Sequence, residues 1–198
     1  MAATRLRLAV VAGPNGAGKS TAAPALLRDQ FRIREFVNAD AIALGMSGFE
    51  PASAAMAAGR AMLDRLDQLA AARRSFAFET TLASRSFAPW IARRRSEGYA
   101  FGLMFLWLPT PELALARVAQ RVAAGGHDVP AAIVRRRFER GLQNFFALYR
   151  PLADQWFVYD NSNLAAPRAI ARGRLLDEAE VLDQEAWNAL CARYAPRS

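Results

Sequence analysis

Five short runs of aliphatic and aromatic residues recur along the chain without the three-and-four spacing that marks an amphipathic helix. The most apolar of them, YAFGLMFLWL, is typical of a central strand that is buried on both faces of a parallel sheet. Because turn residues bound these runs, we predict strands at residues 6–12, 35–40, 75–81, 99–108 and 156–160.

The segments between these runs carry apolar residues three and four positions apart, which indicates amphipathic helices. Met56 and Met62 belong to one such stripe and are expected in the core, whereas Arg93, Arg94 and Arg95 are expected on a solvated face. We predict helices over residues 20–28, 52–72, a segment ending near 96, 112–123, 131–149 and 178–193, with a hairpin or edge strand over 169–176.

The segment between the first strand and the first helix, GPNGAGKST, matches the phosphate-binding pattern G-x-x-x-x-G-K-[ST] at every fixed position. Lys19 is placed to contact the β- and γ-phosphates of ATP, and the Ser20 hydroxyl to bind Mg²⁺. Lys19 is also the only lysine among 26 basic residues, so the other 25 are arginine. The expected nucleotide-binding residues are Gly13, Pro14, Asn15, Gly16, Ala17, Gly18, Lys19, Ser20 and Thr21.

Strands that alternate with helices around such a loop predict a three-layer α/β fold of the P-loop NTPase type. We expect a mainly parallel, five-stranded sheet flanked by helices, in one P-loop kinase domain that spans residues 1–198. Ligands of such sheets bind beyond the carboxyl ends of the strands. The candidate site residues should therefore face one crevice.

The amino-acid composition limits the kinds of site and the cellular location that are expected. Cys191 and His127 are the only cysteine and histidine, so a disulfide within the chain and a Cys/His metal cage are excluded. No uninterrupted apolar run reaches the length of a membrane span, which favours a cytoplasmic protein. The net charge of +8 is consistent with an anionic small-molecule substrate or with binding of nucleic acid. It is equally consistent with solvated arginines on helix faces that bind no ligand.

Acidic and hydroxyl side chains follow two of the predicted strands. Asp40 ends the second strand, before a loop at residues 45–51, and is a candidate base for a substrate hydroxyl or a cap of its own turn. Glu79 is a candidate ligand of acceptor hydroxyls or of a magnesium-bound water, with a buried ion pair as the alternative. Thr80 and Thr81 are candidate substrate contacts or simply good strand residues.

The loop around Gly125 and Gly126 is expected to be a mobile, arginine-bearing lid. His127 lies in it and is expected to bond the loop itself or to contact the substrate. Phosphoryl transfer needs cations beyond lysine and magnesium, and the lid is flanked by Arg117, Arg121, Arg136, Arg137 and Arg140.

Six blocks in order, GPNGAGKST, FVNAD, FETT, FLWLPTPELALARV, GGHDVP with RRRFERGLQNF, and YDNS, resemble the zeta toxin family of P-loop kinases, particularly its short chromosomal members. The resemblance covers residues 6–162. It implies that ATP phosphorylates a hydroxyl of UDP-N-acetylglucosamine or a related sugar nucleotide, and it implies an antitoxin protein as a candidate partner.

The same resemblance implies site roles, with Asp40 as the base and Glu79 and Thr81 holding the sugar nucleotide. It assigns one phosphate-binding arginine to Arg121, or to Arg117 one turn earlier. Where toxins tend to carry a second arginine, this lid reads GGHDVP. His127 or Arg136 is therefore expected to replace it.

Three other classes of protein can be distinguished from a zeta-toxin-like kinase. A regulatory GTPase would need the lysine of N-K-x-D, and Lys19 is already used in the phosphate loop. A kinase of RNA or DNA ends also fits the net charge and would show strongly salt-dependent binding of oligonucleotides. A non-catalytic interaction module is least consistent with the intact Lys19, Ser20 and Asp40.

Overall fold

The computed structural model describes residues 5–48, 51–126, 128–163, 166–175 and 179–196. The strands in these ranges are β1 (Arg7–Ala12), β2 (Glu35–Val37), β3 (Phe76–Thr80), β4 (Ala100–Trp107), β5 (Gln155–Asp160), β6 (Arg168–Gly173) and β7 (Glu180–Val181). They form one seven-stranded sheet in the order β2-β3-β1-β4-β5-β6-β7. The five predicted parallel strands are thus present, and β6 and β7 extend the sheet in antiparallel pairing.

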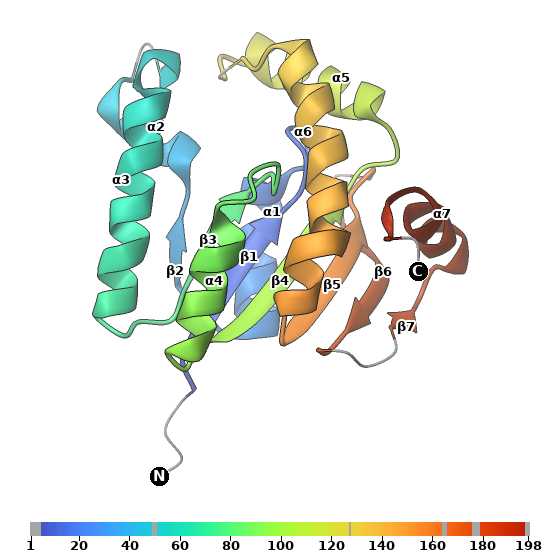
Figure 1. Ribbon diagram of the computed structural model, residues 1–198. Helices are drawn as coiled ribbons and strands as arrows, with labels where there is room; N and C mark the ends of the chain where they lie inside the picture. Colours follow the sequence, from blue (N-terminus) through green and yellow to red (C-terminus); the bar gives the residue numbers. More distant parts are fainter. Residues whose placement is uncertain (1–4, 49–50, 127, 164–165, 176–178, 197–198) are drawn as a thin grey trace.

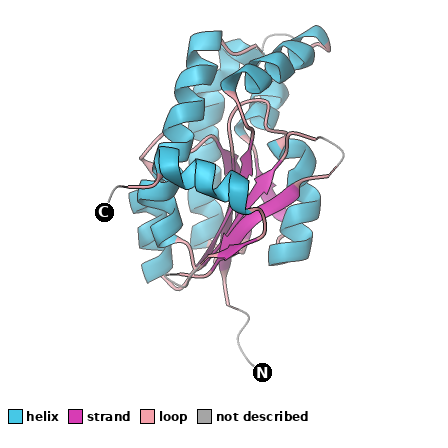
Figure 2. Ribbon diagram, turned by 90° about the vertical axis from the view of Figure 1, so that its right-hand side faces the viewer, coloured by secondary structure: helices cyan, strands magenta, loops and turns pink. Residues whose placement is uncertain are grey.

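Helices cover both faces of this sheet, as the two perpendicular views show (Figures 1 and 2). The helix α1 lies on one face, whereas α3, α4 and α6 lie on the other (Figure 1). The helices are α1 (Lys19–Leu26), α2 (Ala39–Met46), α3 (Pro51–Ala71), α4 (Phe87–Ser96), α5 (Pro111–Ala123), α6 (Ala131–Asn144) and α7 (Gln184–Tyr194). This confirms the predicted three-layer α/β architecture of a P-loop fold.

The helix α1 ends in a π-helical turn, η1 (Leu27–Phe31), and α6 continues into another, η2 (Phe145–Tyr149), followed by the short 3-10 helix η3 (Arg150–Leu152). The turn η1 directs Phe31 toward the central strand β4. A Cβ at Gly102 would overlap the Phe31 ring, so glycine there makes room for the aromatic side chain. None of the helices in the described ranges is both long and apolar enough to cross a membrane.

The predicted strand at residues 35–40 is shorter than expected. β2 ends at Val37, and Asp40 lies in the first turn of α2, not at the end of a strand. Asn38 causes the change, because its side-chain oxygen accepts hydrogen bonds from the backbone N–H groups of Asp40 and Ala41 at 2.7 and 3.2 Å. The expected loop at residues 45–51 is correspondingly shortened, since α2 runs through Gly45.

Two expectations about burial were wrong. Met56 is 76% exposed, whereas Met62 lies in the core as predicted. Arg94 is only 8% exposed, since its guanidinium stacks on Trp90 and pairs with Glu97 at 3.1 Å. An arginine can be buried in this way because the planar cation combines stacking with an ion pair.

Candidate active site

The loop between β1 and α1 curls tightly at the centre of the sheet. Gly13 has a φ of 146° and Gly16 a φ of 77°. A Cβ at Gly13 would overlap the carbonyl oxygen of Leu106, and a Cβ at Gly16 would lie 2.7 Å from that of Ala114. Only glycine combines these angles with these approaches, and a curl of this kind lets backbone amides surround a phosphate.

The amine of Lys19 lies inside this loop, where Nζ donates hydrogen bonds to the carbonyl oxygens of Gly13 and Pro14 at 3.1 and 2.9 Å. Burial lowers the pKa of Lys19, while the carboxylates of Glu79 and Asp40 act in the opposite direction. The lysine therefore lies within the electrostatic range of both predicted acidic residues, which the fold brings together from separate elements.

Ser20 is the centre of a small polar network at the start of α1. Its hydroxyl donates to Glu79 Oε2 at 2.8 Å and accepts from Asn38 Nδ2 at 3.1 Å. Hydroxyl and carboxylate oxygens suit Mg²⁺, which usually takes few protein ligands and completes its shell with waters and substrate phosphates. Among the described residues no group of three or more His, Cys, Asp or Glu side chains could hold a metal by itself.

Asp40 faces the same space from the start of α2. Its exposed carboxylate lies 3.9 Å from Nη1 of Arg121, which comes from the last turn of α5. A cavity of 430 Å³ lies between these elements. The residues that line it are Asn15, Gly16, Gly18, Lys19, Ser20, Thr21, Asp40, Glu79, Arg117, Gln120 and Arg121.

The arginines near the predicted lid fall into different environments. Arg137 is half-buried on α6, with Nη1 at 3.5 Å from Asn15 Oδ1 of the phosphate loop. Burial lowers its pKa first, Arg136 lowers it further, and Asp40 opposes both. Arg136 itself is exposed, as is Arg135, which pairs with Glu112. The arginine of α6 that is turned toward the phosphate loop is therefore Arg137, not Arg136.

Arg117 lies one helical turn before Arg121 on α5 but contacts different groups. Its guanidinium donates to the carbonyl oxygens of Asn161 and Ser162, both at 2.7 Å. Asn161 is 3% exposed, and its Nδ2 donates to the carbonyl oxygen of Ala17 at 2.7 Å. Arg117 thus connects α5 to the turn after β5, and Asn161 connects this turn to the phosphate loop.

The two threonines after Glu79 are engaged in a turn. Thr80 Oγ1 accepts from the N–H of Leu82 at 3.2 Å, and Thr81 Oγ1 accepts from the N–H of Ala83 at 3.4 Å. Their hydroxyl protons can still be donated to a ligand. His127 lies outside the described residues.

Sequence reasoning did not assign roles to Asn38 and Asn161, although both stand inside quoted blocks, FVNAD and YDNS. The signal for Asn38 was present, since asparagine is a preferred helix N-cap and the acidic Asp40 suits the first turn of a helix. Asn161 is a typical turn residue at the end of a predicted strand, but its bond to the phosphate loop gave no local signal, because its partner Ala17 is 144 residues away in the chain.

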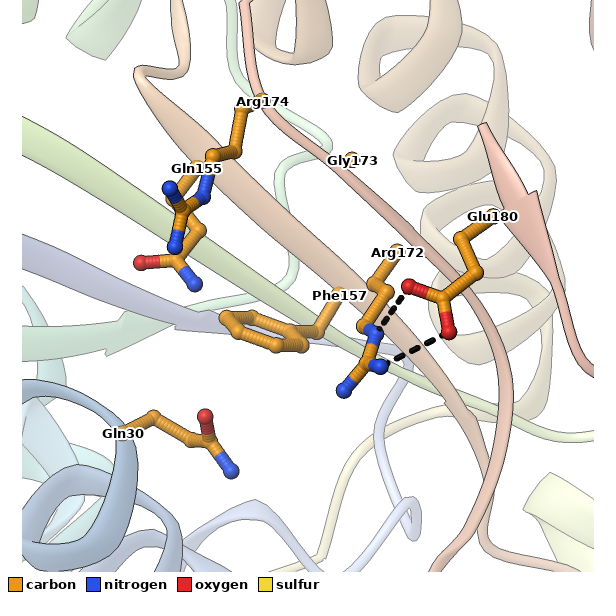
Figure 3. Close-up of a pocket in the computed structure, with 7 residues that line it drawn as sticks. All are labelled: Gln30, Gln155, Phe157, Arg172, Gly173, Arg174 and Glu180. Atoms are coloured by element: carbon orange, nitrogen blue, oxygen red, sulfur yellow. Dashed lines mark hydrogen bonds and ion pairs between the residues drawn. The ribbon is translucent and has the colours of Figure 1, made fainter. Parts of the chain in front are cut away.

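A second cavity, of 490 Å³, lies at the opposite end of the strands, near the start of β5 and the end of β6 (Figure 3). On one side Arg172 donates two hydrogen bonds to the carboxylate of Glu180, each at 2.7 Å (Figure 3). The Phe157 ring lies between this pair and the side chains of Gln30, Gln155 and Arg174 (Figure 3). The cavity shares no lining residue with the site around Lys19.

The sheet order, the glycine-rich loop and the lysine within it define a protein of the P-loop NTPase class. Residues 8–148 match the family AAA_33, described as an AAA domain, and the chain belongs to this family. An uncharacterized protein of Haemophilus influenzae is 29% identical over 128 residues, which are 64% of this chain and 88% of that protein.

Solved structures confirm the fold. A chain in the crystal structure of AvrRxo1-ORF1:AvrRxo1-ORF2 with sulphate ions superimposes with a TM-score of 0.71 at 17% identity, over 98% of this chain and 65% of that one. The same complex with ATP gives a TM-score of 0.68 at 16% identity, again over 98% of this chain and 65% of that one. The PezAT chromosomal toxin-antitoxin system of Streptococcus pneumoniae gives 0.62 at 12% identity, over 98% and 87%.

This chain therefore spans a little less than two thirds of the AvrRxo1 complex chain that it matches. At these identities the likeness is one of fold, and it confirms in architecture the resemblance to zeta-toxin-like P-loop kinases.

Proposed function

We propose that this protein is an ATP-dependent kinase that transfers the γ-phosphoryl group of ATP to a hydroxyl of a sugar nucleotide such as UDP-N-acetylglucosamine. The observation that carries the proposal is that Lys19, the linked pair Ser20 and Glu79, and Asp40 line one cavity with Arg121. The structural neighbour with ATP supports the choice of nucleotide.

Lys19 and the curled loop would bind the phosphates of ATP, which replace the two backbone carbonyl oxygens as partners of the amine. Ser20 would hold Mg²⁺, with Glu79 ordering its waters. When bound, Mg²⁺ would supply positive charge that offsets the negative charge of the ATP phosphates.

Asp40 would accept the proton of the acceptor hydroxyl as that oxygen bonds to the γ-phosphorus and the bond to ADP breaks. Its exposed position at the edge of the cavity leaves room for an incoming substrate. Arg121, which lies beside Asp40, and Arg137, which contacts Asn15 of the phosphate loop, would stabilise negative charge that develops during transfer. Arg137 takes the role that the sequence suggested for Arg136 or His127.

A panel assay tests the proposal directly. The protein is incubated with γ-labelled ATP, Mg²⁺ and, in separate reactions, UDP-sugars, nucleosides and oligonucleotides. Label on a UDP-sugar supports the proposal, whereas label on oligonucleotide ends, with salt-sensitive binding, identifies a nucleic-acid end kinase instead. Lack of both labelled acceptor and ATP hydrolysis would reject a kinase.

We also propose a protein partner of the antitoxin type. Two structural neighbours, the AvrRxo1-ORF1:AvrRxo1-ORF2 complex and the PezAT toxin-antitoxin system, support it. Growth of cells that express the wild-type protein or a Lys19→Ala variant tests the idea. Growth arrest by the wild-type protein alone is the expected result.

A further inference from the structure

The long helix α6 contacts the site at two separate places. In its middle, Arg137 reaches Asn15 of the phosphate loop at 3.5 Å. Its later turns and η2 pack against the segment of residues 81–86, which follows Glu79 and Thr80 at the end of β3 and which we term the β3–α4 loop. Figure 1 shows α6 crossing the face of the sheet beside α4.

Two side chains of this helical stretch donate hydrogen bonds to the β3–α4 loop. Asn144 Nδ2 donates to the carbonyl oxygen of Leu82 at 2.7 Å, and the Tyr149 hydroxyl donates to that of Ser84 at 2.6 Å. Burial raises the pKa of Tyr149 to about 12, so its hydroxyl keeps its proton at any ordinary pH. Leu82 is fully buried with a φ of 56°, a conformation that external contacts must hold.

A third contact depends on the absence of a side chain. Gly141 is a buried residue inside α6, and a Cβ there would overlap the carbonyl oxygen of Thr81. Glycine inside a helix is unfavourable relative to alanine by about 1 kcal/mol. Its presence is explained by the close approach of the helix backbone to the loop.

We propose that Gly141, Asn144 and Tyr149 are positioning residues that fix the β3–α4 loop, so that Glu79 and Thr81 keep their place relative to the phosphate loop. The idea rests on the proposed function, in which Glu79 orders the waters of Mg²⁺, and on the acceptor-binding role that the zeta toxin resemblance implies for Thr81. In this arrangement α6 and η2 form a rigid connection between the phosphate loop and the β3–α4 loop. Arg137 is therefore held in place before substrates bind.

Tyr149→Phe and Asn144→Ala test this proposal, with Gln143→Ala as the matched control on the exposed side of the same helix. Kinetics are measured with ATP and UDP-N-acetylglucosamine as the acceptor probe, and with water as acceptor in ATP hydrolysis. Loss of one hydrogen bond should raise KM for the acceptor or lower kcat by about threefold to tenfold, with KM for ATP unchanged. Amide hydrogen exchange in residues 82–86 should accelerate, whereas exchange in residues 13–18 should not.

Equal behaviour of Asn144→Ala and Gln143→Ala would overturn the proposal. So would a rise in KM for ATP that accompanies a loss of thermal stability, because it would indicate a general weakening of the fold. Gly141→Ala provides an independent variant and should perturb the same loop amides. A failure of the proposed function is recognised separately, because wild-type turnover would then be absent or insensitive to Lys19→Ala. Hydrogen exchange can be measured without turnover. Unchanged exchange in residues 82–86 would therefore still refute the proposal that α6 and η2 fix the β3–α4 loop.

Discussion

Ser20 and Glu79 are 59 residues apart in the chain, yet the serine hydroxyl donates to the glutamate carboxylate at 2.8 Å. The contact follows from the parallel pairing of β1 with β3, which places the phosphate loop and Glu79 at neighbouring strand ends. A carboxylate in this position lies beside the hydroxyl that is expected to bind Mg²⁺.

Glu79→Gln should therefore raise the Mg²⁺ concentration needed for half-maximal activity by about tenfold or more, because the amide loses the negative charge but keeps the shape. Titrations of activity with Mg²⁺ at saturating ATP measure it. An unchanged titration with a raised KM for the acceptor would instead support the acceptor-binding role that the zeta toxin resemblance implies.

Lys19→Ala should leave the fold intact and lower phosphoryl transfer by about 100-fold or more, because the cation on the β- and γ-phosphates is lost while the loop backbone remains. Turnover and thermal unfolding are compared with those of Arg174→Ala, whose side chain lies at the second cavity. Undiminished turnover would contradict the proposed phosphate-binding role.

Asp40→Asn should preserve ATP affinity and reduce transfer to the acceptor by about 100-fold, since the amide cannot accept the proton. Thermal stability should not change, because Asn38, rather than Asp40, caps α2. Single-turnover rates and nucleotide binding separate the two effects. A collapse of ATP affinity with little change in kcat would make Asp40 a binding residue.

Arg121→Ala and Arg137→Ala should each lower kcat by about 10- to 1000-fold with little change in ATP affinity, if both contact charge that develops in the transition state. Arg136→Ala is the neighbouring control for Arg137, and Arg93→Ala on α4 is a distant control; both are exposed. Steady-state kinetics with nucleotide-binding measurements on all four variants decide the matter. Equal small effects in all four would leave Lys19 and Mg²⁺ as the cations in the transition state.

Asp154→Asn tests the electrostatics of the fold. Burial alone would raise the pKa of Asp154, but hydrogen bonds from Arg95 and from the N–H of Phe101 lower it overall. A lowered folded-state pKa stabilises the fold above the unfolded value of about 3.9, and the contribution is lost as pH falls through the folded value.

Asp154→Asn should therefore decrease the free energy of unfolding by about 1 to 3 kcal/mol at pH 7, with the difference shrinking at acidic pH. Denaturant titrations from pH 7 down to acidic pH measure it. Asp29→Asn is the control, because Asp29 forms an exposed ion pair. A difference that persisted unchanged at acidic pH would show that packing rather than charge is responsible.

The sequence was sufficient where a motif or a long apolar run stood alone. The phosphate loop was located from GPNGAGKST, and the central strand from the run that ends at Leu108. Both could be located because their conformation and burial are encoded by residues that are adjacent in the sequence. The short strands β6 and β7 lack such a run. β6 lies where a hairpin or edge strand was predicted over residues 169–176. β7 falls inside the helix predicted over residues 178–193, which begins only at Gln184. The antiparallel pairing of β6 with β5 and of β7 with β6 is set by tertiary contacts that the local pattern does not specify.

Side-chain direction was harder to predict than position. Arg136 and Arg137 are adjacent in sequence, yet a step of one residue around a helix turns one to solvent and the other toward Asn15. The prediction for Met56 was wrong for a related reason, because it lies six residues before Met62 and therefore about 240° away around α3, so the two side chains are on different faces of the helix. Periodicity identifies a face, whereas the neighbouring elements decide how far that face is covered.

The two outer strands of the sheet, β2 and β7, are only three and two residues long. Each carries a glutamate, Glu35 and Glu180, paired with arginine side chains. Long, flat, apolar edges recruit strands from other molecules and seed aggregates. In this sheet the long apolar strands are internal, so a strand from another molecule has only short edges to pair with. The folded protein should therefore stay unaggregated at high concentration.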